Sequence, residues 1–192
     1  MEFLTILLRH TPYRRLLSIV APKTPIPPAA WSRIALFAMD VDGILTDGTI
    51  HVSADGTETK TFSVLDGLGL VRLAAAGVVT AWISGRHSGA TTVRGAELKI
   101  PHLVQGKNDK LSVLCELAAQ HRLDASQIAY MGDDDIDAPA IAWAGIGVSV
   151  PTAMPSALAA AGYVTARPAG LGAVREICDL ILASRHDTGN GK

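Results

Sequence analysis

Short apolar runs alternate with longer amphipathic stretches from Ile34 onward. Residues 34–39, 78–83, 102–104, 128–131 and 146–150 have the aliphatic content of buried strands. Residues 68–77, 108–121 and 172–184 repeat apolar positions at helical spacing; the first stretch stops at Gly77, and Asn108 is a possible cap of the second. This alternation is typical of a parallel sheet with helices on both faces. We therefore predict an α/β domain with a Rossmann-like, three-layer α/β/α arrangement.

One segment departs from this rhythm. Residues 48–64 alternate by two around the pair Asp55-Gly56, which is a strong signal for a β-hairpin. The segment lies between the first strand and the first helix, so we expect the hairpin to project from the domain as a flap.

The beginning of the chain has a different composition. Residues 21–30 contain four prolines and are predicted to form neither a helix nor an inner strand. We therefore divide the chain into an N-terminal extension with a Pro-rich linker (1–30), one domain (31–186) and a disordered tail (187–192). The first 20 residues contain basic side chains between short apolar runs and have neither a secretory signal pattern nor a membrane span. A frayed extension, an upstream start codon and an amphipathic helix on a membrane or partner all fit them.

Composition narrows the classes of function. The chain has 192 residues, enough for one domain, and 48% of them are hydrophobic. Its formal net charge of −1 gives no overall attraction to nucleic acid, so we expect no nucleic-acid partner. Cys115 and Cys178 are too few for a disulfide framework or a thiolate metal site. We interpret both as small buried hydrophobes in a reduced, cytoplasmic protein.

Acidic residues follow two of the predicted strands. Asp40 and Asp42 come directly after the first strand, and two residues apart on an extended backbone they face the same side. The fourth strand is followed by four acids within five residues, at 133, 134, 135 and 137. Such a cluster is repulsive without a cation, and oxygen ligands favour Mg²⁺. Asp135 is predicted to cap the next helix instead.

Two other strand ends supply groups that suit a phosphate. Ser84 and Gly85 follow the second strand and offer a hydroxyl and backbone N–H groups. Lys110 lies in the first turn of a helix beyond the third strand, from which its ammonium group can reach across the site. A carboxylate pair, a hydroxyl, a lysine and a metal-binding cluster at neighbouring strand ends can together perform phosphoryl transfer.

These residues resemble the four motifs of the haloacid-dehalogenase superfamily, in order Asp40/Asp42, Ser84, Lys110 and Gly132-Asp133-Asp134. A closer resemblance is to 3-deoxy-D-manno-octulosonate 8-phosphate phosphatases, which act in lipopolysaccharide biosynthesis. The shared motifs are DVDGxxTDG at 40–48, KxFxVxDGxG at 60–69, QGxxxK at 105–110, GDDxxD at 132–137 and GxGAVRE at 170–176.

The resemblance implies a role for each residue. Asp40 would be the nucleophile and a metal ligand, and Asp42 would transfer protons while its backbone carbonyl binds Mg²⁺. Asp133 would complete the protein ligands. Ser84 and Lys110 would hold the phosphoryl group, and Asp134 and Asp137 would support the ligands or orient Lys110. The substrate contacts implied are Asp42, Gly43, Thr46, Lys60, Ser84, Gly85, Arg86 and Lys110, with Lys60 and Arg86 near the sugar carboxylate.

The spacing of the motifs leaves no room for a cap domain beyond the hairpin. Only 41 residues separate Asp42 from Ser84, and 21 separate Lys110 from Gly132. In the family that this sequence resembles, a neighbouring subunit screens the site from water, which implies a homotetramer.

Several departures leave the substrate open. Leu65 stands where the family usually has arginine, Leu68 where it has an aromatic residue, and residues 166–169 replace a histidine-containing stretch. A nine-carbon sialic-type acid 9-phosphate is the main alternative substrate. A catalytically idle module that mediates assembly is the alternative from another class, and a phosphotransferase or phosphomutase is a third hypothesis.

Overall fold

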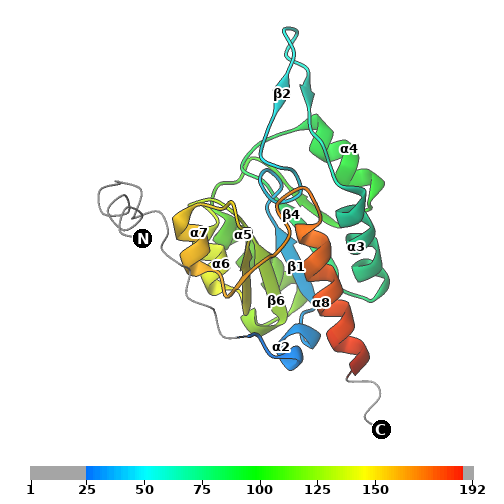
Figure 1. The fold of residues 1–192 in the computed structure, drawn as a ribbon, viewed down its shortest axis with the longest axis vertical. Helices are drawn as coiled ribbons and strands as arrows, with labels where there is room; N and C mark the ends of the chain where they lie inside the picture. Colours follow the sequence, from blue (N-terminus) through cyan, green and yellow to red (C-terminus); the bar gives the residue numbers. More distant parts are fainter. Residues whose placement is uncertain (1–24, 188–192) are drawn as a thin grey trace, which may run out of the picture.

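The computed structural model describes residues 25–187, with side chains as far as Arg185 (Figure 1). The predicted extension up to residue 24, and the predicted tail beyond Asp187, lie outside the described residues. The elements in chain order are α2 (Pro28–Ser32), β1 (Leu36–Met39), β2 (His51–Val52), β3 (Glu58–Thr59), α3 (Val64–Ala75), β4 (Val79–Ile83), α4 (Gly89–Glu97), β5 (His102–Val104), α5 (Lys110–His121), the 3-10 helix η2 (Ala125–Gln127), β6 (Ile128–Met131), α6 (Ala138–Trp143), β7 (Ile146–Ser149), α7 (Pro155–Ala160), β8 (Tyr163–Val164) and α8 (Ala173–Asp187).

The central sheet has six strands in the order β5-β4-β1-β6-β7-β8, and every neighbouring pair is parallel. The five predicted strands are all confirmed, with ends that differ by at most two residues. The sequence did not reveal β8, because it has only two residues and neither is fully buried. A strand this short at the edge of the sheet has no periodicity to detect.

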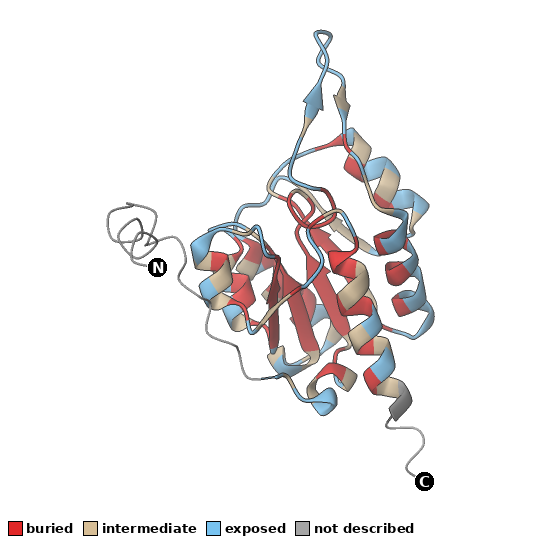
Figure 2. Ribbon diagram, in the orientation of Figure 1, coloured by how far each residue is buried: buried red, intermediate tan, exposed pale blue. Residues whose placement is uncertain are grey.

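The sheet separates two apolar cores, so the predicted three-layer arrangement is confirmed. Leu36 and Ala38 of β1 point to the core under α5, α6 and α7. Phe37 and Met39 point to the opposite core, under α2, α3 and α8. Neighbouring residues of a strand face opposite sides, and both sides are covered here, which explains why β1 is apolar throughout. Figure 2 shows the buried strands between the two helical layers.

The starts of three helices correct details of the prediction. Helix α5 is capped by Asp109, whose carboxylate accepts a hydrogen bond from Ser112 N at 3.0 Å, and not by Asn108. Asp135 does not cap α6, because Asp137 occupies the N-cap position. Asp135 instead accepts a hydrogen bond from the Ser156 hydroxyl at the start of α7. Helix α3 begins at Val64, four residues before the predicted start, because the Ser63 hydroxyl caps it by accepting from Leu65 N.

The prediction that residues 21–30 contain no helix is wrong for residues 28–30. Helix α2 begins at Pro28, where the missing N–H of proline costs no hydrogen bond because the first turn has no acceptor for it. Ile26 and Ala30 also pack against the core under α8. The last residues of the Pro-rich stretch therefore belong to the packed unit, and a domain boundary at residue 31 stays a prediction.

The segment between β1 and α3 forms the predicted hairpin of β2 and β3, two strands of two residues each. In the described residues, the interval from Asp42 to Ser84 otherwise holds only α3 and β4, and the interval from Lys110 to Gly132 holds α5, η2 and β6. Neither interval contains a cap domain, as predicted. Among residues 25–187, no helix has the length and apolar character needed to cross a membrane.

Asp66 connects two of the motifs that are far apart in the sequence. Its buried carboxylate accepts hydrogen bonds from Arg175 N at 2.7 Å and Gly172 N at 3.2 Å, at the start of α8. Burial raises the pKa of Asp66, and the donated N–H groups oppose that rise. The DGxG and GxGAVRE motifs therefore lock α3 against α8 and have a structural role.

Candidate active site

The polar residues predicted from the sequence meet at a switch point of the sheet. The chain runs from β1 to β4 and β5 on one side, and then returns to β6 on the other side of β1. Loops that leave the carboxyl ends of β1, β4, β5 and β6 meet around this point, which is where open α/β sheets bind ligands. They form a pocket of about 200 Å³ lined by Asp40, Asp42, Ser84, Gly85, Arg86, Asn108, Asp133, Asp134 and Ile136.

The loop after β1 is held in a tight turn. Gly43 has a φ of +86°, and a Cβ at this position would collide with the Asp133 carboxylate, so only glycine fits. The Thr46 hydroxyl accepts hydrogen bonds from Gly43 N at 3.4 Å and Gly48 N at 3.2 Å. Thr46 is fully buried and does not line the pocket, so its predicted contact with the substrate stays a prediction, while its contacts here stabilise the loop.

An inner network, consisting of Asp40, Lys110, Tyr130 and Asp137, lies beneath the pocket. Lys110 Nζ is 2.9 Å from Asp40 Oδ1 and 3.2 Å from Asp137 Oδ1, and the Lys110 side chain is 0% exposed. Tyr130 donates its hydroxyl proton to Asp137 Oδ1 at 2.7 Å. Asp137 Oδ2 accepts from the backbone N–H groups of residues 133 and 134. The ammonium is thus paired with two carboxylates, which a buried lysine requires.

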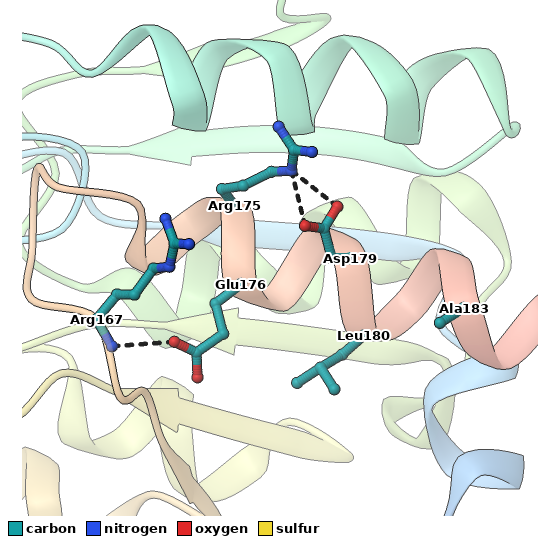
Figure 3. Close-up of a pocket in the computed structure, with 6 residues that line it drawn as sticks. All are labelled: Arg167, Arg175, Glu176, Asp179, Leu180 and Ala183. Carbon is teal, nitrogen blue, oxygen red and sulfur yellow. Dashed lines mark hydrogen bonds and ion pairs between the residues drawn. The ribbon is translucent and has the colours of Figure 1, made fainter.

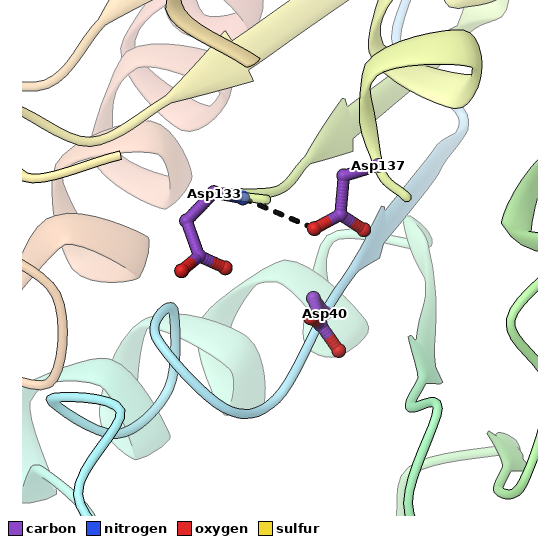
Figure 4. A group of neighbouring side chains, drawn as sticks. All are labelled: Asp40, Asp133 and Asp137. Carbon is purple, nitrogen blue, oxygen red and sulfur yellow. Dashed lines mark hydrogen bonds between the residues drawn. The ribbon is translucent and has the colours of Figure 1, made fainter. Parts of the chain in front are cut away.

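Three carboxylates lie close together, two from the pocket lining and one from the inner network beneath it (Figure 4). One oxygen each of Asp40, Asp133 and Asp137 lies within 4.8 Å of the others. Burial raises the pKa of Asp40 from 3.8 to about 6; the charge of Asp137 adds to the rise and Lys110 opposes it. Burial, followed by the charges of Asp40, Asp137 and Asp134, raises the pKa of Asp133 from 3.8 to about 7. Both shifts come first from burial and then from the neighbouring negative charges, and each disfavours the ionised carboxylate.

This acidic cluster fits a hard divalent cation. Asp133 Oδ1 is buried and has no hydrogen-bond partner among the described residues, which is costly unless a ligand binds it. Asp137 differs, because both of its oxygens already accept hydrogen bonds. The oxygens best placed for an ion are therefore those of Asp40 and Asp133. The predicted ligand set of Asp40, Asp42 and Asp133 stays a prediction.

An outer network, consisting of Asp42, Glu58, Lys60 and Arg86, lies between the pocket and the hairpin. Lys60 Nζ is 2.6 Å from Asp42 Oδ1 and 3.7 Å from Glu58 Oε1. Arg86 donates to Glu58 Oε2 at 2.8 Å, and its Nε is 3.9 Å from Asp42 Oδ2. Glu58 also accepts the Ser88 hydroxyl proton at 2.6 Å. The network joins β3 to the loop between β4 and α4.

The structure brings most of the predicted site residues together. Ser84 is buried at the edge of the pocket, and its hydroxyl accepts from Arg86 N at 3.1 Å. Asp134 lines the pocket, but its carboxylate accepts a hydrogen bond from Asp135 N. Of the two acids predicted to orient Lys110, it is Asp137 that contacts the ammonium group. Lys60 and Thr46 lie outside the pocket lining.

Sequence reasoning missed Tyr130 and Glu58. Tyr130 lies within a strand and resembles an ordinary core residue, so no local signal could have revealed its bond to Asp137. Glu58 lies two residues before Lys60, on the same side of an extended chain, and that spacing could have indicated their pairing.

A second pocket, of about 390 Å³, lies along α8 and is lined by Arg167, Arg175, Glu176, Asp179, Leu180 and Ala183 (Figure 3). Two of its charged residues pair internally, since Arg175 Nε donates to both oxygens of Asp179 at 2.8 Å. Glu176 accepts from the backbone N–H groups of residues 166 and 167. These contacts fix the loop before α8, so we place the chemistry in the smaller pocket.

The sheet order and the motif residues at its switch point define a class of hydrolase. A sequence model of the haloacid dehalogenase-like hydrolases matches residues 79–177. That match covers β4 to α8, including Ser84, Lys110 and Asp133.

Comparisons with individual proteins narrow the class. A 3-deoxy-D-manno-octulosonate 8-phosphate phosphatase of Yersinia pestis is 43% identical over 154 residues, which cover 80% of this chain and 82% of the relative. The crystal structure of such a phosphatase from Moraxella catarrhalis, in complex with a magnesium ion, a phosphate ion and KDO, has a TM-score of 0.81 and 44% identity, and the match covers 84% of this chain and 93% of that one. The cobalt-bound enzyme of Haemophilus influenzae has a TM-score of 0.79 and 36% identity, with 85% and 95% coverage. This chain therefore belongs to the 3-deoxy-D-manno-octulosonate 8-phosphate phosphatase family of the haloacid dehalogenase-like hydrolases.

Proposed function

We propose that this chain hydrolyses 3-deoxy-D-manno-octulosonate 8-phosphate to the free sugar acid and phosphate. The observation that carries the proposal is the contact of Lys110 with Asp40 at 2.9 Å, at the bottom of a pocket whose rim holds Asp42, Ser84 and Arg86. The relatives from Yersinia pestis and Moraxella catarrhalis carry the name of this phosphatase, which favours the eight-carbon substrate over the nine-carbon alternative. The chain keeps all five side chains that the mechanism needs, which disfavours a catalytically idle module; they are Asp40, Asp42, Ser84, Lys110 and Asp133.

Asp40 is the nucleophile in this proposal. Its Oδ1 accepts from Val41 N at 2.7 Å and contacts Lys110, which favours Oδ2 as the attacking oxygen. Attack on phosphorus forms an aspartyl-phosphate and breaks the bond to the sugar oxygen. Lys110 lies where its positive charge offsets the charge that builds on the phosphoryl oxygens.

Asp42 transfers the protons. Its carboxylic acid donates a proton to the departing sugar oxygen in the first step. The resulting carboxylate then takes a proton from a water molecule that attacks phosphorus. That attack breaks the bond to Asp40, releases phosphate and restores both side chains.

Asp40 and Asp133, with the backbone carbonyl of Asp42, would hold a magnesium ion. The unpartnered Asp133 Oδ1 and the raised pKa values of both acids support this ligand set. When bound, the ion supplies positive charge that neutralises phosphoryl oxygens and relieves repulsion among the acids. Excess chelator should stop phosphate release, and added Mg²⁺ should restore it; full activity in chelator would contradict the assignment.

The remaining contacts orient the substrate. Ser84 and Gly85 lie where a hydroxyl and backbone N–H groups can bind phosphoryl oxygens, and Arg86 lies at the open side, where a sugar carboxylate can reach it. Gly43 keeps the β1 loop close to the acids. The predicted substrate contacts of Thr46 and Lys60 are less direct, because both side chains are buried outside the pocket lining.

The substrate assignment is tested by a phosphate-release screen with Mg²⁺. The panel holds 3-deoxy-D-manno-octulosonate 8-phosphate, nine-carbon sugar-acid 9-phosphates and hexose phosphates. We expect the highest kcat/KM for the first compound. The margin over the hexose phosphates should be about 10-fold or more, because a site that pairs with a carboxylate penalises analogues that lack it. A preference for a nine-carbon acid would overturn the substrate while leaving the mechanism intact.

We also infer a homotetramer in which a neighbouring subunit covers the pocket. The open side of the site and the absence of a cap among the described residues support this inference. Sedimentation velocity should then give a tetramer, and a fully active monomer would refute it. A cytoplasmic location and a role in lipopolysaccharide biosynthesis belong to the same proposal. Both cysteines are free, in keeping with a reducing compartment.

A further inference from the structure

Lys60 is a buried lysine that the proposed chemical steps do not use. Its side chain is 0% exposed, and its Nζ lies 2.6 Å from Asp42 Oδ1. A second contact joins Nζ to the Thr91 hydroxyl of α4 at 3.4 Å. A desolvated ammonium group needs an anionic partner, and among the described residues the Asp42 carboxylate is the nearest one.

The direction of Lys60 argues against direct binding of substrate. The pocket is lined by Arg86 on this side, whose side chain is 51% exposed, whereas Lys60 is not part of the lining. A ligand for the sugar carboxylate has to present its charge to the open pocket. Lys60 instead presents its charge to Asp42 Oδ1.

The surroundings hold Lys60 in that direction. Glu58, two residues earlier, accepts hydrogen bonds from the Ser88 hydroxyl and the Arg86 guanidinium at 2.6 and 2.8 Å. Arg86 in turn faces the second oxygen of Asp42, at 3.9 Å. The outer network therefore closes as a ring in which positive and negative side chains alternate. It ties the base of the hairpin to the start of α4.

Asp42 itself has few other restraints. Neither of its carboxylate oxygens has an aligned hydrogen bond within the described residues, and both are shielded from solvent. The next residue is Gly43, whose positive φ shows how sharply the loop turns there. The ion pair with Lys60 is the shortest contact that fixes the Asp42 side chain.

We propose that Lys60 is a positioning residue: it holds the Asp42 carboxylate toward the pocket instead of binding the substrate's carboxylate. The functional part of this inference rests on the proposed function, in which Asp42 transfers protons. Proton transfer depends on geometry, and a displacement of about 1 Å can cost about 100-fold in rate. The hairpin would thus contribute to catalysis from outside the pocket.

A structural test does not depend on activity. Crystal structures of the wild-type chain and of Lys60→Met, with Mg²⁺ and inorganic phosphate, should differ in the conformation of the Asp42 side chain. We expect Asp42 to pair with Lys60 in the wild type and to turn away, or to occupy two conformers, in the variant. An Asp42 side chain that keeps its conformation in Lys60→Met would overturn the proposal.

A kinetic test separates positioning from substrate binding. It compares 3-deoxy-D-manno-octulosonate 8-phosphate with a hexose phosphate, an alkyl ester that also needs its leaving oxygen protonated but has no carboxylate. Lys60→Met should lower kcat by about 100-fold on both esters and change KM by less than about 3-fold. A loss confined to the sugar-acid ester and seen mainly in KM would instead make Lys60 a carboxylate ligand. Lys60→Arg keeps the charge and should recover part of kcat.

Two further variants serve as controls. Lys107→Met removes the charge of an exposed lysine on the neighbouring loop and should leave kcat unchanged. Thr91→Val removes only the second contact of Lys60 and should lower kcat by a few-fold, which keeps the test decisive if Lys60→Met folds poorly. A wild-type chain that hydrolyses neither ester would refute the proposed function, and the crystallographic comparison would still decide what holds Asp42.

Discussion

The inner and outer networks differ in how completely they are buried. In the inner network, Lys110 and Asp137 are fully buried, and Asp40 and Tyr130 are buried as well. In the outer network, Arg86 is half exposed and Glu58 belongs to a hairpin strand of two residues. Fully paired buried charges rigidify a structure, whereas exposed pairs exchange partners at little cost. The inner network therefore suits the attack on phosphorus, whereas the outer network combines proton transfer at Asp42 with substrate recognition at the exposed Arg86.

The largest effect is expected at the nucleophile. Asp40→Asn should lower phosphate release from every ester by about 10⁵-fold or more, because an amide is a poor nucleophile and a weak metal ligand. Steady-state release of phosphate measures the loss, and circular dichroism confirms that the variant folds. Substantial turnover by Asp40→Asn would contradict the covalent mechanism.

Lys110→Met tests how much the inner network contributes to the stability of the folded chain. The substitution leaves two buried carboxylates without their cation, which should lower the free energy of unfolding by about 3–5 kcal/mol. Urea denaturation with an unchanged m-value measures it. A loss below about 1 kcal/mol is no more than an exposed ion pair contributes to stability. Such a result would contradict the view that the inner network is the more rigid of the two.

Asp133→Asn should reveal the repulsion among the acids. The raised pKa values mean that the folded chain keeps protons that the unfolded chain releases between the ordinary value of 3.8 and about 7, so stability falls as pH rises through that window. At pH 8 in chelator the variant should therefore be more stable than the wild type, by about 1–3 kcal/mol. Thermal unfolding at pH 4 and pH 8 measures this difference, which should disappear at pH 4.

Two further measurements complete that prediction. Added Mg²⁺ should reverse the order at pH 8, because the ion stabilises only a chain that can bind it. Glu116→Gln, a change at an exposed acid, is the matched control and should shift neither curve. Equal stability of Asp133→Asn and wild type in chelator at pH 8 would show that the acids do not repel one another as described.

The smallest effect on stability is expected at Arg86. Because its guanidinium is half exposed, Arg86→Met should change the free energy of unfolding by less than about 1 kcal/mol. KM for the sugar-acid phosphate should rise by about 10-fold, while KM for p-nitrophenyl phosphate stays nearly constant. An equal rise for both esters would place Arg86 on the phosphate instead of the carboxylate.

Sequence patterns predicted much of the fold because they are local. The five main strands were visible as apolar runs, and the hairpin was visible from its Asp-Gly turn. Strand β8 and the start of α2 were missed, since two residues show no period and proline in a first turn is indistinguishable from proline in a linker. The motif residues were also predicted to lie at one edge of the sheet, and the structure places them there: Asp40, Asp42, Ser84, Lys110 and Asp133.

The partners of these residues could not be read from the chain. Lys110 and its partner Asp137 are 27 residues apart in the sequence, and Lys60 and Thr91 are 31 residues apart. Such pairs form only when helices and strands pack, because packing decides which buried charges must neutralise one another. The sequence by itself determined which chemical groups lie at the strand ends, because the spacing of apolar residues and the turn-forming residues between them mark where the strands end. Only the tertiary structure decided that Lys60 turns to Asp42 and Tyr130 to Asp137, since burial removes water as the alternative partner.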